Sequence, residues 1–233
     1  MTLLNLANEY NIKLDPKAEQ HFDLYASLLC EWNEKINLTA ITRPDEVMVK
    51  HFLDSLLVLD AVNLPNIAQV IDVGTGAGFP GVPMKIARED IKLTLLDSLN
   101  KRVNFLLDIS QKLGQSDNVC IHGRAEDKAK EAGLREKFDA ATARAVASMS
   151  ALCEYCLPFV KIGGVFIALK GEDVEDELGS AKESIKLLGG AIADIKKYKL
   201  PMGISRSIVV IEKISQTPPK YPRKGVKISK TPL

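Results

Sequence analysis

The first 63 residues carry apolar side chains at spacings of three and four, the period of one face of a helix. Two such series stand out: Phe22, Tyr25, Leu28, Leu29 and Trp32, then Val47, Phe52, Leu56 and Leu59. Arg43-Pro44 interrupts the pattern between them. These spacings predict an N-terminal helical cap over residues 1–64.

After Leu64-Pro65 the pattern changes to short apolar runs separated by helical stretches. The runs are residues 69–73, 91–97, 118–122, 138–143, 163–170, 191–198 and 207–213. Several show no polar alternation, as expected of strands covered on both faces, and helices separate the first five. We therefore expect a doubly wound α/β sheet over residues 65–213, followed by a tail over residues 214–233.

Composition is that of a globular protein: 233 residues, 46% hydrophobic and 26% charged. No apolar run reaches the roughly 18 residues of a membrane helix, and the acidic N-terminus does not resemble a signal peptide, so we expect a cytoplasmic protein. Cys153 and Cys156 form one C-x-x-C pair on a predicted helix. With no second pair, buried thiols are favoured and no metal site is expected.

Charge is unevenly distributed although the formal net charge is only +1. The stretch from Lys213 to Leu233 has six basic residues and no acidic one. Such a segment is either a solvated end or a positively charged segment that lies along a polyanion.

The segment Val70 to Gly81, VIDVGTGAGFPG, places a glycine-rich turn directly after a predicted strand. Glycines here let the backbone turn sharply and approach a ligand closely. A dinucleotide turn would need a third glycine where Phe79 stands, so a phosphate fits poorly. The arrangement of Asp72 with Gly74, Gly76 and Gly78 is instead typical of class I methyltransferases that use S-adenosylmethionine.

Three further signals follow the next three predicted strands. Asp97 can accept hydrogen bonds from ribose hydroxyls, or can cap the following helix. Ala125-Glu126 can meet an adenine edge, although Glu126 also suits the first turn of a helix. Arg144 follows the fourth strand. Because parallel strands end at one edge of a sheet, these signals together predict an adenosine-containing ligand without phosphate.

Longer motifs then resemble one family over nearly the whole chain. They are WNEKINLTAIT (32–42), KHFLDSL (50–56), VIDVGTGAGFPGVPMKI (70–86), TLLDSLNKRVNFL (94–106), GRAED (123–127), ARAVA (143–147), ALKG (168–171) and PPKYPRK (218–224). The chain resembles the RsmG family, also called glucose-inhibited division protein B.

This resemblance implies a Rossmann-like, mostly parallel sheet with an antiparallel last strand. It also implies a 16S rRNA (guanine-N7)-methyltransferase that modifies the 530 loop of the bacterial small subunit. Gly74, Phe79, Ala125-Glu126 and Arg144 would contact S-adenosylmethionine; Asp97 is assigned to the ribose from the fold argument instead.

The residues after the fourth predicted strand are compatible with methylation of guanine N7. Enzymes that methylate exocyclic amines usually carry an Asn/Asp-Pro-Pro-aromatic motif there, and cytosine C5 enzymes carry a nucleophilic cysteine, whereas this chain has Ala143 to Ala147. N7 has a free lone pair and needs no general base, so catalysis would be positioning for in-line displacement. Arg144 could hold the cofactor carboxylate, the guanine or a phosphate.

Basic residues near the predicted site are candidates for RNA contacts, although each alone suits a solvated surface. They are Lys101, Arg102, Arg124, Lys170 and Arg206. His51, beside Phe52 and Leu53, suits a structural role better than that of a proton shuttle.

Three other functions remain open from sequence: a small-molecule methyltransferase, a ribosome-associated cofactor-binding protein without catalysis, and a nicotinamide oxidoreductase, the last weakened by Phe79. The RNA substrate could be naked rRNA, an assembly intermediate or the finished small subunit. Without an exposed heptad seam, a monomer is the expectation.

Overall fold

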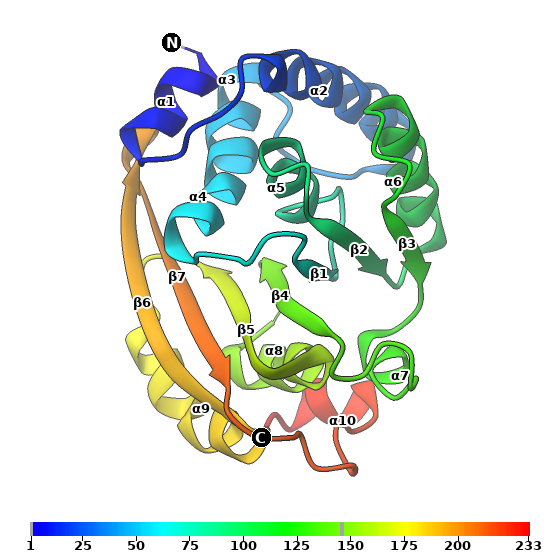
Figure 1. The fold of residues 1–233 in the computed structure, drawn as a ribbon, viewed down its shortest axis with the longest axis vertical. Coiled ribbons are helices and arrows are strands. Elements are labelled where there is room, and N and C mark those ends of the chain that lie inside the picture. The colour runs from blue at the N-terminus through cyan, green and yellow to red at the C-terminus, as the bar shows by residue number, and fades with distance from the viewer. Residues whose placement is uncertain (1, 145–146) are drawn as a thin grey trace.

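The computed structural model describes residues 2–144 and 147–233. One seven-stranded sheet, with strand order β3-β2-β1-β4-β5-β7-β6, crosses the molecule (Figure 1). Its strands are β1 (Gln69–Val73), β2 (Lys92–Asp97), β3 (Val119–His122), β4 (Phe138–Arg144), β5 (Val160–Lys170), β6 (Gly190–Leu200) and β7 (Ile204–Lys213). Each overlaps one of the seven predicted apolar runs.

Strand direction follows the connections. Helices join the first five strands, which pair in parallel, whereas β7 runs antiparallel between β5 and β6. The order reverses between β1 and β4, so the carboxyl ends of these two strands flank the crevice where such sheets bind ligands. The predicted α/β fold and its antiparallel last strand are confirmed.

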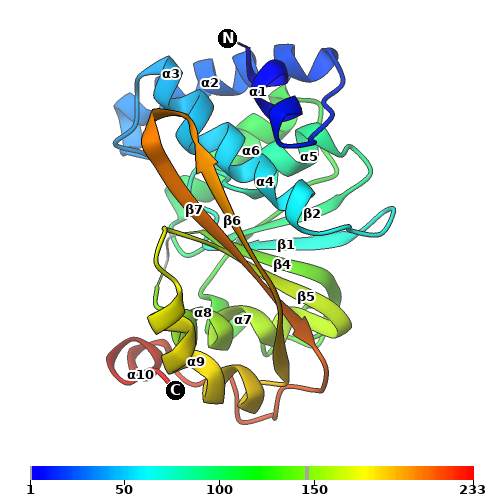
Figure 2. The same cartoon turned by 90° about the vertical axis from the view of Figure 1, so that its left-hand side faces the viewer.

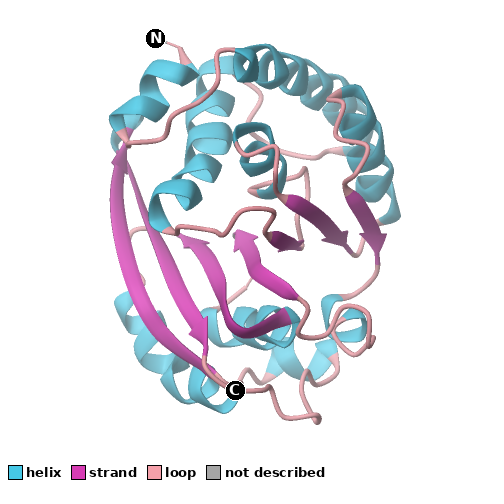
Figure 3. Cartoon of the chain, viewed as in Figure 1, coloured by secondary structure: helices cyan, strands magenta, loops and turns pink. Residues whose placement is uncertain are grey.

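Helices cover both faces of the sheet (Figures 2 and 3). On one face lie α1 (Leu3–Glu9), α2 (Lys17–Ile36), α3 (Pro44–Val47), a π-helical segment (Met48–Leu53), α4 (Asp54–Ala61), α5 (Gly81–Ala87) and α6 (Asn100–Lys112). On the other lie α7 (Ala125–Lys128), α8 (Met149–Cys156), α9 (Glu175–Leu187) and α10 (Gly225–Lys230). Short 3-10 turns span Leu157–Phe159 and Pro201–Gly203.

The helices of the first 61 residues pack directly on the sheet layer. Phe22 and Tyr25 of α2 belong to the same buried hydrophobic cluster as Leu95 of β2 and Phe105 of α6. Burying each such side chain contributes about 1.5–3 kcal/mol. The cap therefore forms part of one core with the layer that supports the glycine turn.

The segment after β7 is not a free end. Lys213 is fully buried, and Thr217, Tyr221 and Ile228 are buried as well. The Arg135 guanidinium donates to the carbonyl oxygens of Thr217 (2.8 Å) and Tyr221 (3.0 Å). The stretch is therefore packed on the protein through its apolar side chains and backbone carbonyls, whereas four of its six basic residues are exposed: Lys220, Lys224, Lys227 and Lys230.

None of the helices within residues 2–144 and 147–233 combines the length and apolar character that a membrane span requires.

Candidate functional site

The glycine turn follows β1 at its carboxyl end. Gly74, Gly76 and Gly78 have φ of +69°, +62° and +94°, a region that L side chains rarely adopt. At Gly78 space is also lacking, since a Cβ would lie 2.7 Å from the Tyr25 hydroxyl and 2.8 Å from Val82 Cγ2. At Gly76 nothing lies within 4 Å of a Cβ, so its backbone faces open space.

Asp72 shapes this turn from inside. Its Oδ2 accepts from Thr75 Oγ1 (2.6 Å) and Gly81 N (2.9 Å), and its Oδ1 accepts from Thr142 Oγ1 (3.1 Å). Burial raises the pKa of the Asp72 carboxyl to about 6, against the opposing effect of these hydrogen bonds. The acid of the glycine motif thus fixes the turn and does not face a ligand.

Asp97 ends β2 and holds the turn from the other side. Its Oδ2 accepts from Gly76 N (2.9 Å) and its Oδ1 from Leu99 N (2.9 Å), just before α6. The carboxyl group also lies 3.5 Å from Arg102 Nη1. Asp97 therefore steadies the start of α6 and lines the crevice at the same time, so the two alternatives from the sequence are compatible.

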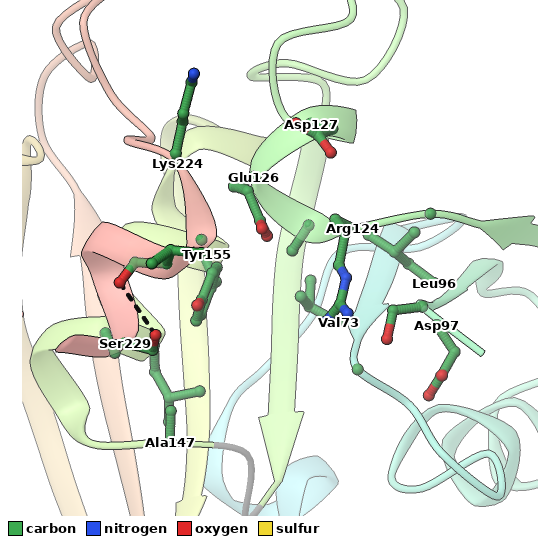
Figure 4. Close-up of a pocket in the computed structure, with 18 residues that line it drawn as sticks. Val73, Leu96, Asp97, Arg124, Glu126, Asp127, Ala147, Tyr155, Lys224 and Ser229 are labelled. Atoms are coloured by element: carbon green, nitrogen blue, oxygen red, sulfur yellow. Dashed lines mark hydrogen bonds between the residues drawn. The ribbon is translucent and has the colours of Figure 1, made fainter.

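A cavity of about 640 Å³ opens on one side of Gly74 and Asp97 (Figure 4). The segment after β3, residues 123–127, forms one wall and includes Arg124, Ala125 and Glu126. Within the described parts of the chain, the Glu126 carboxylate has no hydrogen bond or ion pair to protein. It is therefore available to a ligand, which is what an adenosine site at this position needs.

A second cavity, of about 340 Å³, opens on the other side of the same turn. Gly74 and Asp97 line both cavities, and the second adds Gly76, Phe79 and Arg144. An elongated ligand laid across Gly74 would reach from Glu126 toward Arg144. The structure thus brings the residues of the predicted cofactor site together around one turn.

A third cavity, of about 700 Å³, begins where the second ends. His51 and Arg144 line both, and Lys170 and Arg206 extend the third. Asp54, from α4, lies at its base, and its carboxylate accepts from Arg144 Nη1 (3.0 Å) and Arg206 Nε (2.9 Å). This cavity offers positively charged walls next to the Arg144 end of the cofactor site.

Arg144 is held by the cap. Its Nη1 donates to Asp54 and to the Lys50 carbonyl (3.1 Å), and its Nη2 donates to His51 Nδ1 (3.1 Å). The guanidinium also lies 4.7 Å from the centre of the Phe79 ring. Three of its five N–H groups are thus used, and within residues 2–144 and 147–233 Nε–H and one Nη2–H have no acceptor, so they can bind a ligand.

His51 is a neutral acceptor in this network. A guanidinium can only donate, so Nδ1 must accept and Nε2 must carry the proton that binds Thr39 Oγ1 at 2.8 Å. Burial and, second, the Arg144 charge lower the pKa of His51 to about 3. The ring stacks on Phe79 with centroids 4.5 Å apart. These contacts favour the structural role over that of a proton shuttle.

The candidate RNA-binding cations occupy different environments. Lys101 and Arg124 are exposed, on α6 and beside the first cavity. Arg102 is half-buried next to Asp97. Lys170 forms an ion pair with Glu177 (2.8 Å), and Arg206 forms one with Asp54. These ion pairs hold both side chains in the wall of the third cavity.

Sequence reasoning missed two groups of site residues. Asp54 lies in KHFLDSL (50–56), so only its motif signalled it. Lys224 to Val226 line the first cavity although they lie 98 to 100 positions after Glu126 in the sequence. Ala145 and Val146, within the motif ARAVA, lie outside the described residues.

The cysteine pair lies in α8, in the helical layer that α8 forms with α7, α9 and α10. Cys153 and Cys156 are fully buried, and burial raises the pKa of both thiols. Among the residues that the structure describes, no three His, Cys, Asp or Glu side chains gather as a metal site would require.

Solved structures share this fold. A S-adenosylmethionine-dependent methyltransferase from Aquifex aeolicus, 16% identical, matches with a TM-score of 0.55 over 75% of this chain and 96% of its own. TYW2 from M. jannaschii, in complex with AdoMet, is 14% identical and matches with a TM-score of 0.51 over 66% and 72% of the two chains. At these identities the likenesses show the fold alone. Together with the match to a methyltransferase family model, they place the chain among class I S-adenosylmethionine-dependent methyltransferases.

The model of the rRNA small subunit methyltransferase G family matches residues 18–209. A curated relative, the "Ribosomal RNA small subunit methyltransferase G" of Alkaliphilus metalliredigens (strain QYMF), is 51% identical over 234 aligned residues, covering 100% of this chain and 98% of its own. The chain belongs to this family, as its sequence motifs predict.

Proposed function

We propose that this enzyme transfers a methyl group from S-adenosylmethionine to N7 of a guanine in the 530 loop of 16S rRNA. The family supports an rRNA of the small subunit as substrate. With rRNA as substrate, the enzyme would act in the cytoplasm. The lack of an exposed heptad seam in the sequence supports a monomer.

The cofactor fits the residues around the turn. Gly74 and Gly76 would let its chain pass close to the backbone, Asp97 would accept from the ribose hydroxyls, and Ala125 with Glu126 would meet the adenine edge. Arg144, two of whose N–H groups have no acceptor among the described residues, would bind the carboxylate of the methionine part. When bound, S-adenosylmethionine supplies an electrophilic methyl group on a positively charged sulfur.

One observation carries the choice of N7. The side chains of the third cavity that could act as a general base, Asp54, Glu177 and His51, already accept hydrogen bonds from other protein groups. Asp54 is held by two guanidiniums, and Glu177 accepts from Lys170 Nζ and Met149 N, both at 2.8 Å. His51 accepts from Arg144, and its pKa lies far below neutrality. An exocyclic amine must lose a proton on methylation, whereas N7 attacks through its free lone pair.

The chain's contribution is then positioning and electrostatics. The cavity walls would hold the guanine with N7 facing Arg144's end of the cofactor site. Lys170 and Arg206 would attract the RNA, with Lys101 and Arg124 contacting phosphates outside the cavity. Asp54 and Glu177 offset only part of this charge, so the walls remain positive. The remaining N–H groups of Arg144 would bind the cofactor carboxylate and not N7 itself.

Methyl transfer to small-subunit RNA from cells that lack the endogenous enzyme tests the proposal. Labelled S-adenosylmethionine is incubated with naked 16S rRNA, assembly intermediates and mature subunits, and the product is mapped for N7-methylguanine. One modified guanine in the 530 loop is the expected result, and the preferred particle identifies the substrate. Label on an exocyclic amine, or none despite cofactor binding, would contradict it.

A further inference from the structure

The wall of the first cavity beside Glu126 comes from the C-terminal segment. Lys224, Gly225, Val226 and Ser229 line the cavity together with residues 123–127 after β3 (Figure 4). Two views of the fold place α10 beside α8, away from the cap (Figures 1 and 2). The basic tail therefore closes a space that the sheet alone would leave open.

Glu126 and Gly225 meet closely at this wall. A Cβ on residue 225 would overlap Glu126 Oε1 and lie 2.9 Å from its Cδ. The φ of Gly225 is not in the left-handed region, so a side chain here would act through space alone, by displacing the end of the flexible Glu126 side chain. Glu126 has no polar partner within the described residues, and the backbone at Gly225 closes one side of the space that its carboxylate can occupy.

The segment is fixed next to this contact by an ion pair. Arg223 donates to the fully buried Glu154 carboxylate of α8 through its backbone N (2.7 Å), Nε (2.8 Å) and Nη2 (2.6 Å). A forked guanidinium–carboxylate pair is both strong and geometrically specific. We call this pair the C-terminal clamp; it stands two residues before Gly225.

We propose that the C-terminal segment is a working part of the cofactor site: the clamp holds α10 in place, and the backbone at Gly225 positions the Glu126 carboxylate for the cofactor. The proposal rests on the placement of adenosine in the first cavity. Arg223 and Gly225 act through Glu126, so they are positioning residues, and cofactor affinity depends on a segment outside the α/β sheet.

The first test is a double-mutant cycle between Gly225→Ala and Glu126→Ala. Calorimetric titration with S-adenosylhomocysteine should show about tenfold weaker binding for G225A, the loss that one displaced charged hydrogen bond produces. In the E126A background G225A should cause no further loss, because no carboxylate remains to be displaced. Gly179→Ala, on the exposed side of α9 with nothing within 4 Å, is the matched control.

The second test removes the clamp without stranding a buried charge, by the double replacement Arg223→Met and Glu154→Met. The KM for S-adenosylmethionine should rise while the KM for rRNA stays unchanged, and Arg223→Lys should retain part of the affinity. If the double variant fails to fold, the Gly225 cycle decides alone.

Gly74→Asp separates this proposal from the placement it rests on. Equal, additive losses for G225A in both backgrounds, or no loss in either, while G74D abolishes binding, would overturn the role of the segment and leave the site in place. Normal binding by G74D as well would show that the cofactor lies elsewhere.

Discussion

The His51 network should make the stability of this protein depend on pH in a way that one substitution can isolate. His51→Asn keeps an oxygen that can accept from Arg144 Nη2 but cannot bind a proton. In the folded wild type, burial and the neighbouring guanidinium lower the pKa of His51 from 6.5 to about 3. The unfolded chain therefore binds a proton at residue 51 at pH values where the folded protein does not.

The sign and size follow from these values. The stabilisation from neutral His51 is complete above pH 6.5 and is lost as pH falls, by about 2 kcal/mol between pH 8 and pH 5 at 1.36 kcal/mol per pKa unit. Asp72 acts in the opposite direction, since its pKa is raised from 3.8 to about 6 in the folded state. Its protonation adds about 1.4 kcal/mol of stability over the same range. The wild type alone would thus show little net change.

The prediction therefore concerns the difference in the free energy of unfolding between wild type and H51N. Urea unfolding followed by far-UV circular dichroism at pH 5, 6, 7 and 8 gives the free energy of unfolding of wild type and H51N. At pH 8 the variant should be less stable, and this gap should shrink by about 2 kcal/mol at pH 5. His122→Asn, at an exposed position, is the control. A gap that is the same at pH 5 and pH 8 would refute the reasoning.

Four further predictions concern the turn and the RNA surface. Gly74→Asp should abolish cofactor binding, because it adds a charged side chain at φ +69°, and Asp97→Ala should weaken binding about tenfold while far-UV circular dichroism stays native. Gly78→Ala should lower the free energy of unfolding by about 2 kcal/mol more than Gly114→Ala: both have positive φ, but only at residue 78 would the Cβ meet a buried hydroxyl at 2.7 Å. Lys101→Ala should weaken rRNA binding and lower the slope of log K against log salt by about 1, as removal of one phosphate contact does; an unchanged slope would place RNA elsewhere.

The sequence by itself determined the sheet and the place of the site. Seven apolar runs lie within a few residues of the seven strands because strands buried on both faces need continuous apolar stretches. The glycines at residues 74, 76 and 78 predicted the turn, since their φ values exclude most other residues. Motif order over the whole chain identified the family, which no single turn could do.

The tertiary structure alone decided which charged groups are available to a ligand. Asp72 and Asp97 look alike in sequence, since each lies at or next to the end of a strand, yet one is enclosed by hydroxyls and the other lines two cavities. The state of Arg144 depends on Asp54 and His51, about 90 positions earlier.

The charges of the C-terminal segment also depend on the tertiary structure. Its six basic residues indicate solvent or a polyanion, but Lys213 and Arg223 instead pair with acids brought to them by the fold. Local patterns set backbone shape and burial because those depend on neighbouring residues. Ionic pairing and access to a cavity depend on side chains distant in sequence, and only the folded chain places them together.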